Sequence, residues 1–117
     1  MKKILVIEDE PNIVVIVKII LEEEGYLVYK LTGPTEFKTV LRESKADLVL
    51  LDLNIAGIDG KIICVYIKDQ NDLKNIPVIL MSANHNVRQV KDECGADDLI
   101  RKPFDLNYLI GTVGAYI

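Results

Sequence analysis

Four short apolar runs, with no long one among them, set what this chain can fold into. They are Ile4–Ile7, Leu48–Leu51, Val78–Met81 and the shorter pair Leu99–Ile100. Continuous apolar runs of this length are typical of strands covered on both faces, as in a parallel sheet packed between helices. A fifth run, Tyr26–Leu31, is more amphipathic and predicts an edge strand.

Helical stretches separate these predicted strands. We expect helices over residues 12–24, 35–44, 61–70, 87–94 and 105–116. Gly25 and Gly95 follow two of them as stop signals. A strand followed by a helix thus occurs five times, which predicts an α/β fold with a parallel sheet. With 117 residues and no repeat, linker or low-complexity segment, residues 1–117 are expected to form one domain.

The composition argues against several classes of protein. Lys and Arg number 14 against 18 acidic residues, a net charge of −4 that disfavours direct binding to nucleic acid. The longest apolar stretch, Ile13–Leu21, is interrupted by Lys18 and is too short to span a membrane. Cys64 and Cys94 are far apart without metal-ligand spacing, so we expect small core residues in a reducing compartment. A cytoplasmic domain is the expectation.

Reactive side chains gather where the predicted strands end. Glu8 and Asp9 follow the first strand of the chain, Asp52 the third, Ser82 the fourth and Lys102 the fifth. Ligands of open α/β sheets bind outside the carboxyl ends of the strands. Three carboxylates, a hydroxyl and an ammonium group are therefore expected to converge on one edge of the sheet.

This combination of groups favours phosphoryl transfer. Neighbouring carboxylates repel one another unless a cation compensates them, and Mg²⁺ prefers oxygen ligands that include a phosphate oxygen. Asp52 would then act as a nucleophile toward phosphorus and form an aspartyl phosphate. Lys102 and Ser82 would hold two of the phosphoryl oxygens and Mg²⁺ the third.

Five segments, in order, resemble the receiver domain of two-component response regulators, the CheY-like superfamily named for its chemotaxis regulator. They are Ile4–Pro11, Asp47–Asn54, Ile58–Gly60, Ile76–Ala83 and Gly95–Phe104. The resemblance covers essentially the whole chain. It implies a doubly wound, flavodoxin-like (βα)5 fold whose five-stranded parallel sheet has the order 2-1-3-4-5.

The resemblance also implies roles for individual residues. Asp52 is expected to be the phosphoacceptor, with Glu8 and Asp9 as the acidic pair that binds Mg²⁺. The backbone carbonyl of Asn54 is expected to complete the metal's protein ligands. Asn54 and Asn84 would flank the path of the water that hydrolyses the phosphoaspartate.

A second group of residues is expected to form the switch. Ser82 would follow the phosphate, with Ala83 next to it, and Lys102 would be joined to Pro103 by a cis peptide bond. Leu99 departs from the family, which usually has Tyr or Phe there. Two further departures are Ala56, where a proline is common, and a last helix without Lys or Arg, which argues against a dimer held by salt bridges at that helix.

The first predicted helix offers a candidate docking surface. At 100° per residue, one apolar face is expected to pack on the sheet; it consists of Ile13, Ile16, Val17 and Ile20. Val15 and Ile19 then point outward. In the family this helix meets a sensor histidine kinase or histidine phosphotransfer protein. That the two residues are ordinary exposed aliphatics remains the alternative.

We therefore expect a Mg²⁺-dependent phosphoacceptor, a monomer or weak dimer that assists its own phosphorylation and dephosphorylation but is not an enzyme. Its output face would comprise the helix over 87–94, the strand at 99–100 and the last helix. A haloacid-dehalogenase-type phosphatase is a rival, but it needs a second Asp where Asn54 stands. A binding module that works without phosphorylation is another, supported by Leu99. An effector domain after Ile117 stays possible.

Overall fold

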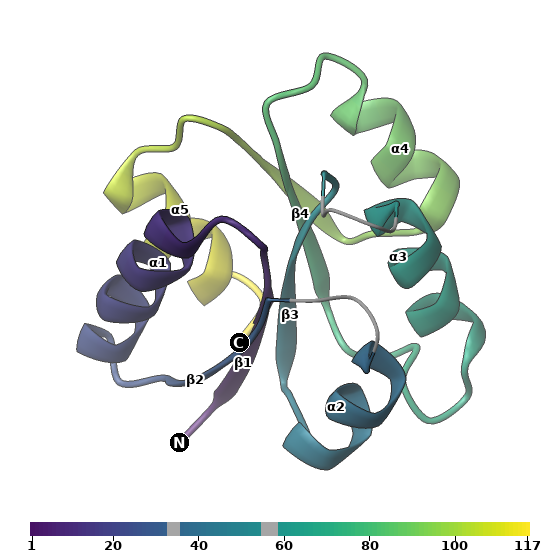
Figure 1. Ribbon diagram of the computed structural model, residues 1–117, viewed down its shortest axis with the longest axis horizontal. Coiled ribbons are helices and arrows are strands. Elements are labelled where there is room, and N and C mark those ends of the chain that lie inside the picture. The colour runs from purple at the N-terminus through teal and green to yellow at the C-terminus, as the bar shows by residue number, and fades with distance from the viewer. Residues whose placement is uncertain (33–35, 55–58) are drawn as a thin grey trace.

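The computed structural model describes residues 1–32, 36–54 and 59–117, and within them five strands alternate with five helices (Figure 1). The strands are β1 (Lys3–Ile7), β2 (Leu27–Leu31), β3 (Leu48–Asp52), β4 (Val78–Ser82) and β5 (Asp98–Arg101). The helices are α1 (Pro11–Glu23), α2 (Phe37–Ser44), α3 (Gly60–Asp69), α4 (Val87–Cys94) and α5 (Leu106–Gly114). The predicted strand–helix order is confirmed.

The strands form one parallel sheet in the order β2-β1-β3-β4-β5. This is the doubly wound, flavodoxin-like order that the sequence resemblance implied. The order reverses at β1, so the first connections of the chain run toward one edge and the later ones toward the other. As expected, β2 lies at an edge and is partly exposed, whereas every residue of β3 and β4 is buried.

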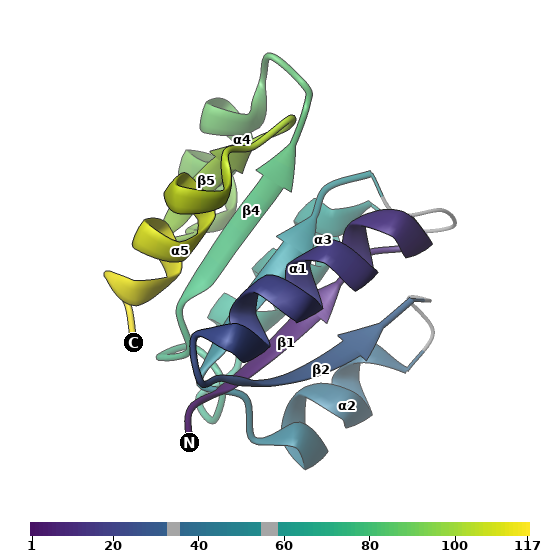
Figure 2. The same cartoon turned by 90° about the vertical axis from the view of Figure 1, so that its left-hand side faces the viewer.

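Helices cover both faces of the sheet. Figures 1 and 2 show α1 and α5 together on one face and α2, α3 and α4 on the other. Successive residues of β1 alternate between the two cores: Ile4 and Val6 belong to the α1/α5 side, and Leu5 and Ile7 to the opposite side. This alternation explains why the central strands are apolar throughout, because each side chain meets a covering helix.

The face of α1 that packs on the sheet overlaps the predicted one but is shifted around the helix. Val17 is buried and Ile13 and Ile20 pack against the core, as expected. Val14 and Leu21 are buried as well, while Ile16, which we expected to be buried, is 52% exposed. Apolar side chains surround most of this helix, so their spacing alone does not determine its rotation. The protein instead turns α1 so that Ile16 joins Val15 and Ile19 on the outer face.

Local signals account for several element ends. Pro11 stands at the first position of α1, where its missing N–H costs nothing. Gly25 and Gly95 have φ angles of 93° and 80°, as turns that follow helices require. The departure at Ala56, and the start of the predicted second helix at residue 35, lie outside the described residues. Among those that are described, no helix is long and apolar enough to cross a membrane.

Candidate functional site

The register of the sheet brings the predicted site residues to one edge. Ile7 pairs with Leu51, so Glu8 and Asp52, the next residue of each chain segment, lie beside one another. Ser82 ends the adjacent strand β4 opposite Arg101, and Lys102 follows directly. All of these side chains therefore stand at the carboxyl ends of neighbouring strands.

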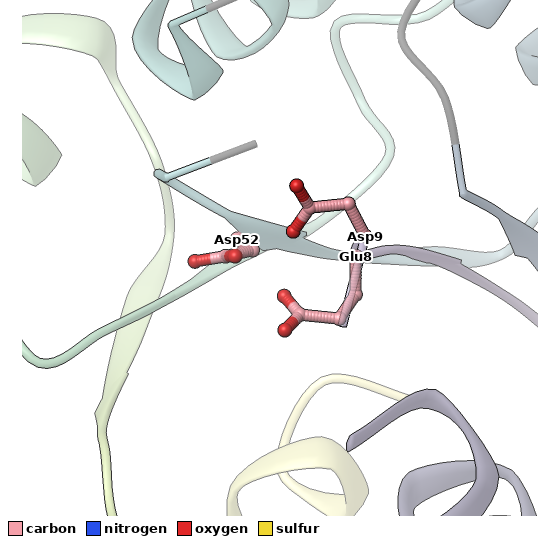
Figure 3. Close-up of side chains that lie close together, drawn as sticks. All are labelled: Glu8, Asp9 and Asp52. Carbon is pink, nitrogen blue, oxygen red and sulfur yellow. The ribbon is translucent and has the colours of Figure 1, made fainter. Parts of the chain in front are cut away.

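Three carboxylates converge there, from Glu8, Asp9 and Asp52 (Figure 3). One oxygen of each lies within 4.8 Å of the others. Glu8 and Asp52 are buried and Asp9 is partly exposed. A partly open cluster of oxygen ligands suits a hard cation such as Mg²⁺, which keeps part of its water shell.

Lys102 supplies the positive charge of the site. Its Nζ lies 3.0 and 3.3 Å from the two carboxylate oxygens of Glu8 and 3.4 Å from Oδ1 of Asp52. The peptide bond from Lys102 to Pro103 is cis, the conformation that the resemblance implied. The ammonium group is mostly buried and therefore less screened by water than a surface lysine.

Burial and the neighbouring carboxylate of Asp52 change the protonation of Glu8. Burial, followed by a hydrogen bond between its carboxyl group and that of Asp52, raises the pKa of Glu8 to about 8 against the opposing effect of Lys102. One ammonium group thus does not compensate the negative charge of the cluster. A divalent cation bound to these oxygens would favour the ionised form of Glu8.

Asn54 and Asn84, each two positions after a site residue, form a hydrogen-bonded bridge next to the site. The backbone N–H of Asn54 donates to Oδ1 of Asp52 at 3.2 Å, and that of Asn84 donates to Oγ of Ser82 at 3.0 Å. The amide of Asn84 also donates to Oδ1 of Asn54 at 3.2 Å. The segments that follow the candidate phosphoacceptor and the candidate switch hydroxyl are therefore directly connected.

A polar cavity of about 360 Å³ opens beside this bridge. Its lining consists of Leu53, Asn54, Asp59, Lys61, Asn84, Asn86 and Val90. The cavity therefore lies next to the residues that follow Asp52 and Ser82.

The other predicted switch residues line pockets near the site or pack in the core. Ala83 is exposed and lines, with Pro103, an apolar pocket of about 410 Å³ between the start of α1 and the loop after β5. Leu99 is 5% exposed and packs in the core shared with α3 and α4. It also borders a groove that Arg88, Arg101 and Tyr108 line, between α4, β5 and α5.

The outer face of α1 is apolar, as predicted. Val15 and Ile19 are 53% and 55% exposed, and Ile16 extends the same surface. Ile16 also lines the pocket beside Lys102, so this surface is continuous with the edge of the site.

Sequence reasoning missed two features of the site. It placed Glu8 among the metal ligands but did not anticipate its two contacts with Lys102. It named Asn54 and Asn84 separately, without the hydrogen bond that joins them. No signal in the sequence could reveal these pairs, because they depend on how loops from different strands lean toward each other.

Fold and site together define a class of protein: a doubly wound α/β domain with an acidic cluster and a lysine at the switch point of its sheet. Comparison with known families places it more closely. A model of the response regulator receiver domain matches residues 4–114. The chain therefore belongs to the response regulator receiver family of two-component signalling.

Individual relatives agree with this assignment. The chain is 31% identical to the DNA-binding dual master transcriptional regulator RpaA of Synechocystis, over 100% of this chain and 49% of that protein. It is 32% identical to the DNA-binding response regulator MtrA of Mycobacterium tuberculosis, over 97% of this chain and 50% of that protein. The chain thus spans about half the length of these curated relatives.

Solved structures share the fold. The receiver domain of a signal transduction histidine kinase from Syntrophus aciditrophicus has a TM-score of 0.91 and 35% identity, covering 99% of this chain and 89% of that one. The chemotaxis response regulator CheY4 of Vibrio cholerae has a TM-score of 0.92 at 22% identity, covering 100% and 99%. The CheY-like fold is confirmed.

Proposed function

We propose that this receiver accepts a phosphoryl group on Asp52 from a phosphohistidine, in a Mg²⁺-dependent reaction. The observation that carries the proposal is the convergence of Asp52 with Glu8, Asp9 and the Lys102 ammonium group at one edge of the sheet. Each of these groups has a task in phosphoryl transfer, which needs mainly positioning and neutralisation of charge.

In the proposed step, a carboxylate oxygen of Asp52 attacks phosphorus. The new P–O bond forms as the P–N bond to the donor imidazole breaks, and the departing nitrogen takes up a proton. Lys102, 3.4 Å from Asp52, holds one oxygen of the transferred group, and the hydroxyl of Ser82 holds another. Charge-assisted hydrogen bonds of this kind are the strong ones.

The metal site would consist of the carboxylates of Glu8, Asp9 and Asp52, with the backbone carbonyl of Asn54. In the described part of the chain, Lys102 is the one cation paired with Glu8 and Asp52, which leaves an excess of negative charge. Mg²⁺, when bound, would offset this charge and attract a phosphoryl oxygen.

Phosphorylation would then bias an equilibrium between two conformations. The new anion gives Ser82 and Lys102 a ligand to hold in one of them. We propose that the response reaches a face made by α4, β5 and α5, where Leu99 lies beneath a groove. Leucine can change rotamer there, but it offers a partner neither a ring nor a hydroxyl group.

The proposed partners follow from these surfaces. A sensor histidine kinase or phosphotransfer protein would dock on α1 through Val15 and Ile19. Such donors obtain their phosphoryl group from ATP, so we place the protein in the cytoplasm. We propose that residues 1–117 act as one receiver domain, monomeric or weakly dimeric, with no direct contact with nucleic acid or membrane.

Intact-mass spectrometry tests this function. The protein is incubated with acetyl phosphate, with Mg²⁺ or with EDTA, beside an Asp52→Asn variant. We expect one phosphoryl group on the parent with Mg²⁺ and none in the other two samples. If the parent stays unmodified, with a phosphorylated kinase as donor as well, a binding module that works without phosphorylation becomes the better reading.

A further inference from the structure

The two cysteines of the chain meet in the folded protein. Cys64 of α3 and Cys94, the last residue of α4, are 30 positions apart in sequence, and both are buried. The thiol of Cys64 donates to the backbone oxygen of Cys94 at 3.5 Å, and each of the two side chains shifts the pKa of the other. This contact between α3 and α4 therefore places the two cysteines of the chain beside each other.

Their surroundings give the two thiols different characters. The hydrogen bond from Cys64 lowers the pKa of Cys94 to about 7, and the nearby charge of Lys61 acts in the same direction. That bond, together with burial, raises the pKa of Cys64. The thiolate is the reactive form of cysteine, so Cys94 is the nucleophile of the pair and Cys64 its proton donor.

Cys94 is also the thiol closer to solvent. It is 4% exposed, against 0% for Cys64, and the exposed residue Gly95 follows it at the end of α4. No atom outside the chain neighbours lies within 3.4 Å of a β-carbon built on Gly95. This helix end is therefore the side from which a small oxidant would approach the pair.

We propose that Cys64 and Cys94 form an oxidisable dithiol that a peroxide closes into a disulfide between α3 and α4. The Cys94 thiolate attacks one peroxide oxygen, and the O–O bond breaks to leave a sulfenic acid and hydroxide. The sulfur of Cys64 then attacks that of Cys94, so the S–S bond forms and water leaves. In sum, the two thiols lose two hydrogens and hydrogen peroxide becomes two waters.

The disulfide would fasten α4 to α3. Because α4 belongs to the proposed output face, oxidation would hinder a movement of this helix and so weaken the response to phosphorylation. That consequence rests on the proposed function. Formation of the disulfide does not, because it involves neither Asp52 nor the carboxylate cluster.

Thiol counting by intact mass tests the proposal. The folded, reduced protein is treated with hydrogen peroxide, unfolded in iodoacetamide and weighed, with a urea-unfolded sample treated identically. We expect a monomer that has lost two hydrogens and takes up no alkyl group, and that takes up two alkyl groups after reduction. The folded protein should form this product several-fold faster than the unfolded one.

Variants separate the steps. Cys64→Ser should stop at the sulfenic acid of Cys94, which dimedone traps, and Asp52→Asn should form the disulfide as the parent does, whatever the outcome for phosphorylation. The proposal is overturned if the parent gains oxygen without losing hydrogens, if the product is a disulfide-linked dimer, or if folding brings no increase in rate.

Discussion

Gly60 lies directly against the backbone of Asp52, with no room for a side chain between them. A β-carbon built on Gly60 would stand 2.5 Å from the carbonyl oxygen of Asp52 and 2.8 Å from the α-carbon of Leu53. The N–H of Gly60 also donates to the backbone oxygen of Leu53 at 3.2 Å. The start of α3 is thus docked on the two residues that end β3 and follow it, one of which is the candidate phosphoacceptor.

Gly60→Ala is therefore expected to disturb both stability and the site. Its methyl group meets backbone atoms, which move only if the end of β3 shifts, and overpacking of this kind costs about 1–3 kcal/mol. Urea unfolding measures the loss of stability. The same shift moves the carboxylate of Asp52, so phosphorylation by acetyl phosphate should also become slower in an intact-mass time course.

Gly111→Ala is the matched control. A β-carbon there has nothing within 4 Å and the residue lies inside α5, so alanine should raise stability by about 0.4–1 kcal/mol. Phosphorylation should be unchanged. Equal effects of the two substitutions on stability would contradict the close packing of Gly60 on Asp52.

Lys102→Met should slow phosphorylation without abolishing it. The variant keeps Asp52 and the other two carboxylates, but it loses the ammonium group 3.4 Å from the attacking residue. Charge-assisted hydrogen bonds contribute about 1.5–3 kcal/mol, so the initial rate with acetyl phosphate should fall about tenfold or more. Lys18→Met, which removes only an exposed pair with Glu22 at 3.9 Å, should leave the rate as it is. If Lys102→Met is phosphorylated as fast as the parent, this lysine has no role in the reaction.

Asn84→Ala should shorten the lifetime of the phosphoaspartate. It removes the hydrogen bond to Asn54 and so opens the approach of water to Asp52. The phosphorylated variant should lose its phosphoryl group several-fold faster than the parent once acetyl phosphate is removed. Mass spectrometry at successive times measures this loss. Asn86→Ala, on the lining of the same cavity, serves as the control, and Asn84→Lys should alter the lifetime as well. An unchanged lifetime in both Asn84 variants would rule out a role for this bridge.

A double substitution on α1, Val15→Glu with Ile19→Glu, should impair docking alone. Both residues are more than half exposed, so the charges have little effect on folding. Transfer from a phosphohistidine donor should become at least several-fold slower, while acetyl phosphate should react as before. Ile62→Glu, at a 56% exposed position of α3 on the opposite face, is the control. Equal slowing with both donors would indicate damage to the site and refute the docking surface.

Much of the fold and the membership of the site could be predicted from local features. Buried parallel strands are apolar throughout, which makes runs such as Ile4–Ile7 conspicuous. The carboxyl ends of such strands meet at one edge, so the order of the strands places Asp52, Ser82 and Lys102 together. Both inferences need only the order of the elements and the parallel direction of the strands.

The rotation of α1 could not be obtained in this way. Its apolar residues surround most of the helix, and spacing alone predicts a buried Ile16, which is 52% exposed. The choice of Val14, Val17 and Leu21 as the buried face depends on the shape of the sheet surface and of α5 beside it. Periodicity describes a single helix, whereas its rotation is settled by what packs against it.

The strand–helix order, the buried strands and the set of polar side chains at the strand ends can be predicted from sequence, because each follows from short-range pattern and from the geometry of parallel sheets. Which of these groups touch depends on the folded chain: Lys102 contacts Glu8, Asn84 contacts Asn54, and Cys64 contacts Cys94. These contacts join residues at least 30 positions apart, and at that range the packing of helices and the path of loops set the distances, which no local pattern encodes.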